Sequence, residues 1–409
     1  MKCRHCASTL SLPFLDLGSA PPSNAYLTPA GLNAAELWYP LRLLVCATCW
    51  LVQTEDHAGR EALFDKNYAY FSSFSSSWLA HAQTYVEAMR RRFELGAGSL
   101  VAVVAANDGS LLQYVAQAGE PCYGIEPTAS TAAAAKARGI YIVERFFGVD
   151  LALELAALGK QADLIVANNV LAHVPDINDF VAGFSHLLKA DGVATFEFPH
   201  LMRMVQLCQF DTAYHEHYSY LSLHAVQRIF AANGLQVFDV QELPTHGGSL
   251  RVFAQRAASG RLPVGAGVGE LLEREAQAGM CGADFYAGFQ LQARRIKREL
   301  LSFLLSVDGA GGSVAAYGAA AKGNTLLNFA GVRPDLLAFV VDLNPAKQGK
   351  FMPGSRIPIV DEAHLRRCRP SHVLLLPWNL KHELVAQLGF VRDWGGVFVT
   401  AVPRLEVLA

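Results

Sequence analysis

The chain has 409 residues, of which 52% are hydrophobic and 17% are charged, and its formal net charge is −2. A chain this long and this apolar can bury the cores of roughly two to three domains, which excludes a disordered protein. The near-neutral balance, without a block of basic residues, argues against nucleic acid as the main partner. No apolar run reaches the ~18 residues of a membrane span, and the N-terminus lacks an apolar signal segment. We therefore expect a cytoplasmic protein that binds neither nucleic acid nor a membrane.

Two CxxC pairs lie in the first 50 residues, Cys3 with Cys6 and Cys46 with Cys49. Such pairs can place four thiolates tetrahedrally around one Zn²⁺. Redox motifs and structural disulfides are the alternatives, and a reducing cytoplasm disfavours both. Because four thiolates leave no open coordination position, we expect a structural zinc ion that does no chemistry. The remaining cysteines are single, lie in apolar surroundings and are expected to be buried: Cys122, Cys208, Cys281 and Cys368.

The rest of the chain divides into repeated α/β patterns. An aromatic and serine-rich segment, residues 67–78, precedes a predicted helix that ends near Gly96. From Ser99, short apolar runs alternate with helical stretches, which is typical of a doubly wound parallel sheet. A glycine-rich break at 257–269 and a predicted amphipathic helix over 284–306 lead out of this unit.

A second α/β unit begins at Ser313 with a strand, a glycine-rich turn and a helix, and Asp342 ends the next strand. This is the pattern of a nucleotide-binding half-fold. The sequence therefore predicts an α/β protein with a small zinc-binding module in residues 1–66 and a Rossmann-like domain in residues 67–258. Linker helices and a second Rossmann-like domain follow in residues 259–409. Two such domains suggest two ligands.

In the first Rossmann-like domain, a turn of Asn107, Asp108 and Gly109 connects the first strand to its helix. Glu126 ends the second strand, where a carboxylate can accept from both hydroxyls of a ribose. The turn lacks the GxGxxG glycines of a dinucleotide site, so a nucleoside without phosphate, such as S-adenosylmethionine (SAM), fits better. The alternative is an ordinary Asn-Asp-Gly turn with a capping glutamate.

The segment AYHEHYSYLS, residues 213–222, gathers proton-handling groups in an otherwise apolar chain. A carbon next to a ketone becomes nucleophilic only after losing a proton, and the enolate oxygen then needs stabilising donors. A histidine, with an ordinary pKa of about 6.5, suits the removal of such a proton. The alternative is a capping segment with satisfied core histidines, which is our expectation for His215 and Tyr218.

The order of the motifs resembles that of the SAM-dependent sugar C-methyltransferases, which methylate C3 of nucleotide-linked 4-keto-deoxysugars. The resemblance covers essentially the whole chain and is carried by both CxxC pairs, ANDGSLL, GIEPT, NNVLAHVPD, FEFPHL, YHEHYSYLS, HGGSLR, YGAAAKGNTLLN and LPWN. It implies a zinc-binding N-terminal domain, a central SAM domain and a C-terminal domain that helps to hold the nucleotide sugar. Val103 and Ala105 depart from the Glu and Gly of the family's usual E-x-G, and Val103 removes a carboxylate near the cofactor's amino group.

The resemblance also implies roles for single residues. His217 resembles the family's base, and Tyr214 and His173 are expected to donate to the enolate oxygen. Glu216 is expected to orient a histidine or bind a sugar hydroxyl, and Tyr68 matches a further active-site tyrosine. The predicted SAM contacts are Asn107, Asp108, Gly109, Glu126, Pro127, Asn168 and Asn169.

Two further motifs are predicted to meet the substrate. THGGSLR offers His246, an approachable backbone at Gly247 and the hydroxyl of Ser249 to the sugar, with a plain tight turn as the alternative. In the second Rossmann-like domain, a helix N-terminus and an ammonium group can meet a diphosphate, and the alternative is a plain helix. The residues are Gly318, Lys322, Gly323 and Asn324.

The predicted function is SAM-dependent methylation at C3 of a nucleotide-linked 4-keto-deoxysugar, with dTDP as the expected nucleotide, by a protein expected to be a monomer. Because the SAM methyl group carries its own leaving group, the transfer requires no metal. An O- or N-methyltransferase acting on a nucleotide sugar and a non-catalytic nucleotide-sugar-binding protein are the alternatives.

Overall fold

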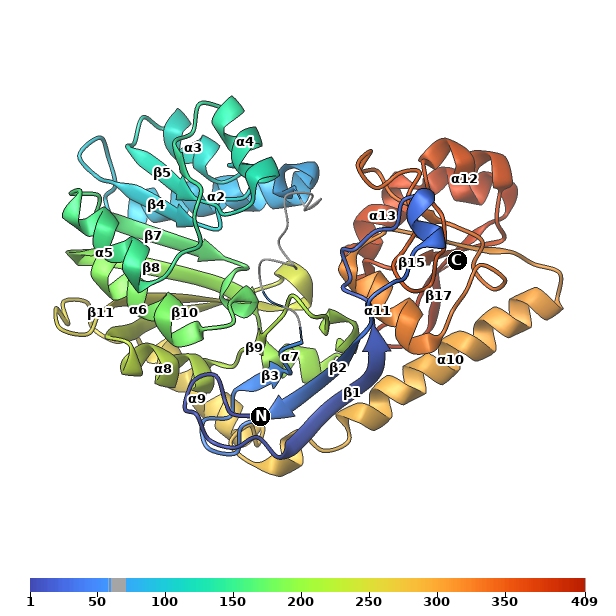
Figure 1. Ribbon diagram of the computed structural model, residues 1–409, viewed down its shortest axis with the longest axis horizontal. Coiled ribbons are helices and arrows are strands. Elements are labelled where there is room, and N and C mark those ends of the chain that lie inside the picture. Colours follow the sequence, from blue (N-terminus) through green and yellow to red (C-terminus); the bar gives the residue numbers. More distant parts are fainter. Residues whose placement is uncertain (58, 60–70, 409) are drawn as a thin grey trace.

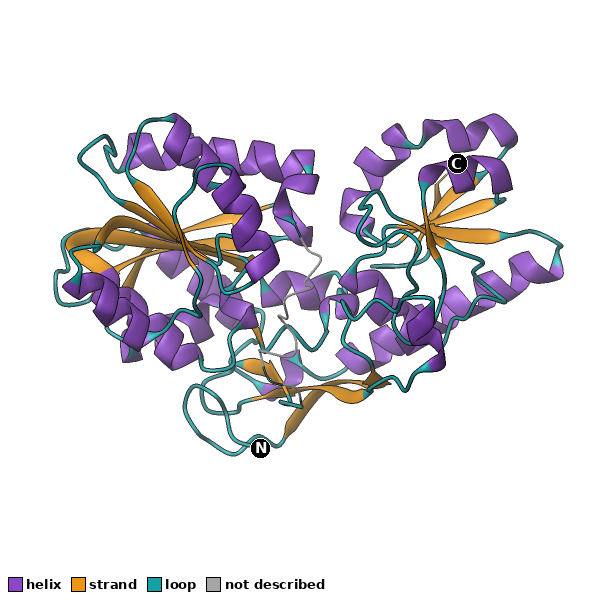
Figure 2. Ribbon diagram, turned by 45° about the horizontal axis from the view of Figure 1, so that its top comes forward, coloured by secondary structure: helices purple, strands orange, loops and turns teal. Residues whose placement is uncertain are grey.

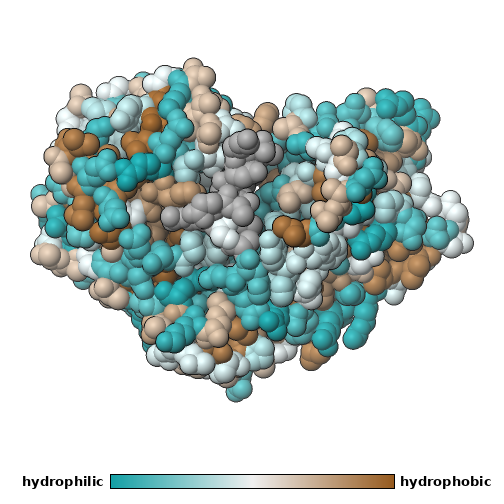
Figure 3. Space-filling view, in the orientation of Figure 1, coloured by the Kyte–Doolittle hydropathy of each residue, from teal (hydrophilic) through white to brown (hydrophobic). Residues whose placement is uncertain are grey.

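Three β-sheets organise the protein in the computed structural model, which describes residues 1–57, 59 and 71–408. Two sheets lie in separate lobes, and the N-terminal sheet lies below and between them in the view of Figure 1. The outline of the molecule is indented between the lobes, and hydrophobic side chains form several separate groups on this face (Figure 3).

The N-terminal sheet has the strand order β1-β2-β3-β9 and is antiparallel. Along β2 the buried residues Leu41, Leu43 and Val45 recur with a period of two, which places one face of the sheet against the core. The last strand, β9, comes from the middle of the chain and follows His217. The elements are β1 (Leu12–Ala20), η1 (Ala30–Asn33), β2 (Tyr39–Val45), β3 (Val52–Thr54) and β9 (Ser219–Tyr220). We call residues 1–54 the N-terminal module.

The middle lobe is built on a seven-stranded sheet with the order β10-β11-β8-β7-β4-β5-β6. From β8 to β6 the strands are parallel, and helices lie on both faces (Figure 2), which explains why these strands are nearly continuous apolar runs. The strands are β4 (Val101–Val104), β5 (Cys122–Ile125), β6 (Ile142–Val143), β7 (Ala162–Asn168), β8 (Leu188–Pro199), β10 (Leu235–Leu243) and β11 (Ser249–Arg256). The helices are η2 (Ser72–Phe74), α2 (Ser76–Arg92), α3 (Leu112–Gln117), α4 (Ala129–Ala137), α5 (Val149–Ala157), η3 (Leu171–His173), α6 (Ile177–Leu187), α7 (Leu201–Gln206), η4 (Phe210–Thr212), α8 (Leu223–Ala232) and η5 (Thr245–Gly247).

The C-terminal lobe contains a six-stranded sheet with the order β14-β13-β12-β15-β16-β17, parallel except for β17. Its strands are β12 (Val314–Tyr317), β13 (Val340–Val341), β14 (Ile359–Val360), β15 (His372–Leu375), β16 (Val397–Thr400) and β17 (Glu406–Leu408). Its helices are α11 (Ala321–Ala330), α12 (Glu362–Cys368), η7 (Trp378–Leu380), α13 (Lys381–Gln387) and η8 (Gly389–Trp394).

The lobes are connected by α9 (Ala266–Gln277), η6 (Ala283–Phe285) and the long helix α10 (Phe289–Gly309). The predicted helix over 284–306 begins too early, because Gly288 has a φ of +85° and separates η6 from α10. The start of α10 packs on the N-terminal module, where the rings of Phe14 and Phe289 stack with centroids 4.6 Å apart. One buried hydrophobic cluster therefore includes residues of the N-terminal module and of both lobes.

The predicted fold class is confirmed: the chain is α/β, with a cysteine-bearing N-terminal module and two Rossmann-like parallel sheets. The division into 1–66, 67–258 and 259–409 stays a prediction, and its first boundary lies outside the described residues. Two single cysteines correct the expected burial, because Cys281 and Cys368 are exposed in loop and helix-end positions. Among the described helices, none combines the length and apolar character needed to cross a membrane.

Candidate active site

The carboxyl ends of β4 and β5 bring two predicted cofactor residues together. The backbone N–H of Asn107 donates to Glu126 Oε2 over 2.9 Å, and the N–H of Thr128 donates to Oε1, also over 2.9 Å. Glu126 is buried, and burial raises the pKa of its carboxyl group. These bonds hold the carboxylate at the edge of the sheet, beside the turn that follows β4.

The rest of this turn is held by protein contacts. Asp108 is buried, accepts from the hydroxyl of Ser73, and lies 3.5 Å from Nη2 of Arg138. Gly109 has a φ of +78°, and a Cβ added there would lie 2.4 Å from Cδ1 of Ile140. These contacts explain the presence of Asp108 and Gly109 in the turn without a ligand, and their contact with SAM stays a prediction.

The neighbouring strand β7 ends in Asn168, whose side chain lies at the same edge of the sheet. Both polar side-chain atoms of Asn168 are buried and lack a hydrogen-bond partner among the residues that the structure describes. Asn169 has a φ of +53°, and its Nδ2 lies 3.3 Å from Nε2 of His246. Pro127 is half-buried directly after Glu126. Because a buried amide without partners is costly, Asn168 is suited to meet polar groups of a ligand.

His217 is buried, and its hydrogen bonds define its tautomer. Nδ1 lies 3.0 Å from the carbonyl oxygen of Thr212, and Nε2 lies 2.7 Å from the hydroxyl of Tyr214. A carbonyl oxygen can only accept, so Nδ1 carries the hydrogen and Nε2 carries the basic lone pair. Burial lowers the pKa of His217 well below 6.5, and the neighbouring His173 lowers it further. The imidazole is therefore neutral, with Nε2 able to accept a proton.

His173, at the end of η3, lies beside His217 with ring centroids 4.6 Å apart. Its Nδ1 lies 2.9 Å from the carbonyl oxygen of Glu216 and therefore carries the hydrogen. Burial lowers the pKa of His173 to about 4, so the ring is neutral and its Nε2 can only accept. The expected donation from His173 to an enolate oxygen would require a hydrogen on Nε2, and this role stays a prediction.

Glu216 lies in the same segment and contacts the N-terminal module. Its Oε1 accepts from Nδ2 of Asn24 over 3.2 Å. Its Oε2 is buried and has no hydrogen-bond partner within residues 1–57, 59 and 71–408. Burial raises the pKa of this carboxyl group. One oxygen of Glu216 is thus held by protein, and the other is left for a donor such as a hydroxyl.

The remaining residues of the segment pack against the N-terminal module. His215 Nε2 lies 3.3 Å from the carbonyl oxygen of Pro40, and the guanidinium of Arg4 lies 5.3 Å from the ring centroid of Tyr218. These contacts agree with the packing role expected for His215 and Tyr218. Tyr68 lies outside the described residues, so its predicted place in the site stays a prediction.

The THGGS turn lies between the two lobes. A Cβ added at Gly247 would come 2.6 Å from Cη2 of Trp378, so glycine permits the close approach of the C-terminal lobe. The hydroxyl of Ser249 donates to the carbonyl oxygen of Thr245 over 2.9 Å and closes the turn. His246 lies beside Trp78, with ring centroids 5.6 Å apart, and burial lowers its pKa to about 4. These contacts are those of the tight-turn alternative, and contact with the sugar stays a prediction.

Lys322, near the start of α11, is the predicted substrate residue that carries a positive charge. Its Nζ lies 3.3 Å from Oδ1 of Asn379 and 4.9 Å from the ring centroid of Trp378. Burial lowers its pKa, and the nearby Asp211 opposes this effect. The charge of Lys322 also contributes, after burial, to the lowered pKa of His246. The structure thus brings Lys322 toward the same region as the histidines.

The other predicted residues around Lys322 have packing roles. A Cβ at Gly318 would lie 2.4 Å from Cγ of Pro377, and a Cβ at Gly323 would lie 2.6 Å from Cδ1 of Leu376. The two glycines therefore let the loop after β15 approach the turn after β12, at Gly318, and the first turn of α11, at Gly323. Asn324 is buried, and its Nδ2 has no partner in the described part of the chain.

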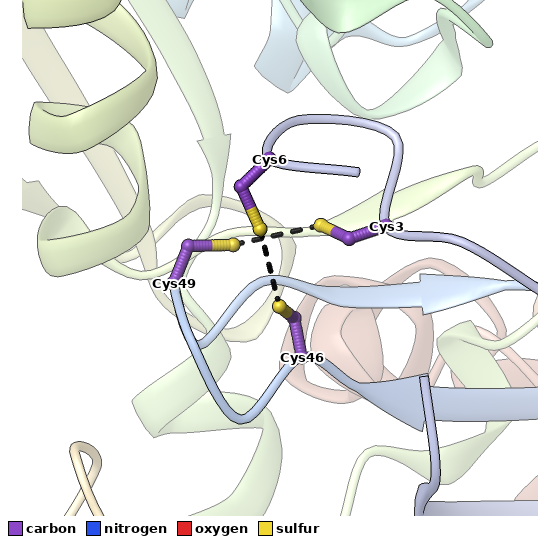
Figure 4. A group of neighbouring side chains, drawn as sticks. All are labelled: Cys3, Cys6, Cys46 and Cys49. Carbon is purple, nitrogen blue, oxygen red and sulfur yellow. Dashed lines mark hydrogen bonds between the residues drawn. The ribbon is translucent and has the colours of Figure 1, made fainter. Parts of the chain in front are cut away.

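The four cysteines of the CxxC pairs form one cluster (Figure 4). Their Sγ atoms all lie within 4.8 Å of one another, with 3.5 Å between Cys3 and Cys49 and between Cys6 and Cys46. A tetrahedral zinc ion with Zn–S bonds of about 2.3 Å requires sulfur atoms about 3.8 Å apart. Small shifts would bring all four thiolates to this geometry, so the cluster fits one zinc ion.

Comparisons with known families agree with this arrangement. Residues 3–64 match a zinc binding domain, residues 104–240 match a methyltransferase domain, and residues 244–403 match a C-methyltransferase C-terminal domain. The C-methyltransferase NovU of Streptomyces niveus is 32% identical over 408 residues, which are 100% of this chain and 97% of that protein. The chain belongs to the SAM-dependent C-methyltransferase family.

Two solved methyltransferase structures are similar to part of the chain. The magnesium protoporphyrin IX methyltransferase of Synechocystis PCC 6803 with bound SAH is 19% identical and has a TM-score of 0.36, over 44% of this chain and 84% of that chain. The 1,6-didemethyltoxoflavin-N1-methyltransferase of Burkholderia thailandensis is 15% identical and has a TM-score of 0.36, over 50% of this chain and 95% of that chain. Both TM-scores are low, and no residue assignment rests on them.

For this C-methyltransferase, family membership decides between the predicted alternatives. It confirms the predicted enzyme with SAM and zinc as cofactors. A C-methyltransferase family excludes the two alternatives, an O- or N-methyltransferase and a non-catalytic binding protein. The closed set of four thiolates suits a structural zinc. The contacts of Asn168 and Glu126 with SAM stay predictions.

Sequence reasoning missed two residues that contact this candidate site, Asn24 and Asp211. Asn24 binds Glu216 from 192 positions away, and no local signal in the sequence connects the two. Asp211 accepts from Nε1 of Trp378 over 2.7 Å and joins the lobes beside Lys322. Its position just before the segment 213–222 was a usable signal, because buried carboxylates near titratable groups often belong to sites.

Proposed function

We propose that this C-methyltransferase methylates C3 of a nucleotide-linked 4-keto-deoxysugar and that His217 is the base. The observation that carries the proposal is the fixed tautomer of His217, whose neutral ring presents a basic Nε2 to the hydroxyl of Tyr214. A neutral base next to a mobile hydroxyl donor is the pair of groups that enolate formation needs.

In the proposed reaction, His217 Nε2 takes the C3 proton. The electron pair of the C3–H bond forms the C3–C4 double bond of an enolate, and the negative charge moves to the C4 oxygen. The Tyr214 hydroxyl, 2.7 Å from Nε2 in the protein alone, turns to the C4 oxygen, which frees the base and stabilises the oxyanion. When bound, SAM supplies an electrophilic methyl group with its own leaving group, and C3 is the atom that receives it.

Other residues are assigned by the polar atoms that they leave available. Glu216 Oε2 accepts from a sugar hydroxyl, while Asn24 holds Oε1. Lys322 faces the diphosphate, which suits a cation in low-dielectric surroundings. Glu126 and Asn168 bind SAM.

The test is the exchange of the C3 hydrogen with deuterated water in the presence of the demethylated cofactor. His217→Asn keeps a polar side chain but removes the proton acceptor, so exchange and methylation both fall by ~10²–10⁴, the usual cost of losing a general base. SAM affinity, measured by calorimetry, stays unchanged. Tyr214→Phe gives a smaller loss of both rates.

His215→Asn is the matched control, because this neighbouring histidine packs against Pro40, and its exchange rate stays near that of the wild type. Exchange at the wild-type rate in His217→Asn would remove His217 as the base. If the wild type exchanges no hydrogen in any nucleotide-linked 4-keto-deoxysugar, the substrate class is wrong.

A further inference from the structure

Strand β3 connects the cysteine cluster to the segment that carries the proposed base. Cys49 lies three positions before Val52, the first residue of β3. β3 pairs with β9 so that Val52 lies opposite Tyr220 and Gln53 opposite Ser219. β9 begins two residues after His217, and Figure 1 shows both strands below the middle lobe. The N-terminal module thus reaches the backbone next to His217.

Thr54, the last residue of β3, binds this backbone directly. Its hydroxyl donates to the carbonyl oxygen of His217 over 3.1 Å, and its N–H donates to the carbonyl oxygen of Tyr218 over 3.1 Å. Thr54 is 2% exposed, so water does not compete strongly for these bonds. Two groups of one residue therefore fix two consecutive carbonyls of the segment.

Gln53 and Arg4 connect the cysteines to the same strand. Gln53 is fully buried, and its Nε2 lies 3.3 Å from Cys3 Sγ. Its Oε1 accepts from the backbone N–H of Arg4 over 2.9 Å, and Nη2 of Arg4 donates to the carbonyl oxygen of Thr54 over 2.9 Å. The Arg4 guanidinium also covers the ring of Tyr218. Both CxxC pairs are thus linked to the segment, one through the chain after Cys49 and one through side chains beside Cys3.

The opposite side of the segment is held by the middle lobe. The N–H of Tyr218 donates to the carbonyl oxygen of Ala172 over 2.8 Å. The N–H of Leu201 donates to the carbonyl oxygen of Leu221 over 2.9 Å. These bonds do not involve the N-terminal module, so loss of the β3 contacts should loosen the segment without unfolding the lobe. A displacement of about 1 Å at a reacting group can cost ~10² in rate, so such loosening affects a base strongly.

We propose that the zinc site sets the position of the catalytic base: zinc fixes Cys3 relative to Cys49, and β3 transmits this order to residues 217–220. Thr54, Gln53 and Arg4 are then positioning residues for His217. The inference rests on the proposed role of His217. It gives the zinc ion, which does no chemistry itself, an effect on the rate through the position of His217.

The first test needs no substrate. Amide hydrogen exchange is measured by mass spectrometry on the full chain with zinc and after treatment with a chelator. Exchange rises in peptides covering residues 1–56 and 213–222 and stays unchanged in β4, β5 and β7. Unchanged exchange in 213–222 after zinc loss would overturn the proposal. A rise over the whole chain would overturn it too, because zinc would then hold the entire fold.

The second test uses variants that keep all four cysteines. Thr54→Val removes the hydroxyl at nearly constant volume, and substrate C–H exchange and kcat fall about tenfold while KM, SAM affinity and zinc content stay unchanged. Thr54→Ser restores the hydroxyl and the rates. Thr28→Val is the matched control, because the hydroxyl of the exposed Thr28 accepts from the N–H of Gly31 within the same module, away from residues 213–222 in the sequence.

Equal rates in Thr54→Val and the wild type would overturn the positioning role. Failure of the proposed substrate class would instead leave the amide-exchange result intact, because that measurement depends only on the zinc and the protein. The two proposals can therefore fail separately.

Discussion

At the residue scale, Ala105 stores backbone strain at the edge of the proposed cofactor site. It follows β4 directly and has a φ of +56°, a left-handed conformation that glycine adopts readily and alanine does not. The resembling family has glycine at this position, and the structure gives the physical reason for that glycine. The departure at Ala105 therefore costs stability whether or not its methyl group touches SAM.

Ala105→Gly is expected to raise the free energy of unfolding by about 0.5–1 kcal/mol, because relief of the strained φ exceeds the added entropy of the unfolded chain. SAM affinity is expected to stay the same or increase. Urea denaturation and calorimetry measure the two effects. Ala106→Gly is the control, because Ala106 is buried without a positive φ and should lose stability. A loss of stability in both variants would contradict the assignment of strain.

At the element scale, α9 is fastened to the middle lobe by one buried carboxylate. Glu275 is fully buried and accepts from the N–H groups of Leu223 and His224, which form the first turn of α8, over 2.7 and 2.9 Å. It also binds the rings of His200, over 2.7 Å, and His224, over 3.0 Å. Although burial raises the pKa of Glu275, the hydrogen bonds from His200 and His224 lower it to about 2. A negative charge at the N-terminus of a helix also interacts favourably with the helix dipole.

Glu275→Gln is expected to lower the free energy of unfolding at pH 7 by about 3 kcal/mol. The amide keeps one acceptor oxygen where the carboxylate has two, and its NH₂ group would face donors that it cannot bind. The folded pKa lies below the unfolded value of 4.5, so this stability is present above pH 4.5 and is lost as the pH falls toward 2. In urea titrations, the difference in the free energy of unfolding between Glu275→Gln and the wild type should therefore become smaller as the pH falls from 4.5 toward 2. Glu273→Gln, exposed on the same helix, should stay within ~0.5 kcal/mol of the wild type, and an equal loss there would refute the role of Glu275.

At the scale of the whole molecule, the C-terminal lobe is attached to the segment that carries the proposed base. Thr325 of α11 donates to the carbonyl oxygen of Ala213 over 2.8 Å, and Trp378 donates to Asp211 over 2.7 Å. The N-terminal module reaches the same lobe, where the hydroxyl of Tyr26 donates to the carbonyl oxygen of Ala319 over 2.5 Å. Three parts of the chain therefore meet at residues 211–220, and their packing brings Lys322 to the proposed substrate site.

Lys322→Gln is expected to weaken the binding of a nucleoside diphosphate by about 10- to 100-fold, the range for losing one charged hydrogen bond. SAM affinity should not change, because the proposed SAM residues lie at or just after the ends of β4, β5 and β7 in the middle lobe. Calorimetry with each ligand separates the two effects. Lys381→Gln is the control, because Lys381 pairs with Glu406 at the surface of the same lobe. Equal losses for both ligands would show that Lys322 supports the fold rather than the diphosphate.

Local patterns determined the fold class and the metal site. The alternation of short apolar runs with helical stretches predicted both parallel sheets. A strand that is covered on both faces consists almost entirely of apolar residues, so its own sequence indicates its burial. The CxxC pairs predicted the cysteine cluster, because each pair brings two thiolates together through the chain itself. The turn after β4 and Glu126 after β5 were found for the same reason, since the carboxyl ends of neighbouring parallel strands share one edge.

The tertiary structure decided what residue types and spacings leave open. His217 and His173 are residues of the same type, yet each tautomer depends on a backbone carbonyl, of Thr212 or Glu216, that packing places beside Nδ1. The contact of Asn24 with Glu216 and the pairing of β3 with β9 join segments more than 160 positions apart. The sequence by itself determined the elements and the kinds of chemistry, because both depend on near neighbours. Which nitrogen of His217 is basic, which oxygen of Glu216 is held and which module contacts the proposed base depend on contacts that exist only after the three parts have packed together.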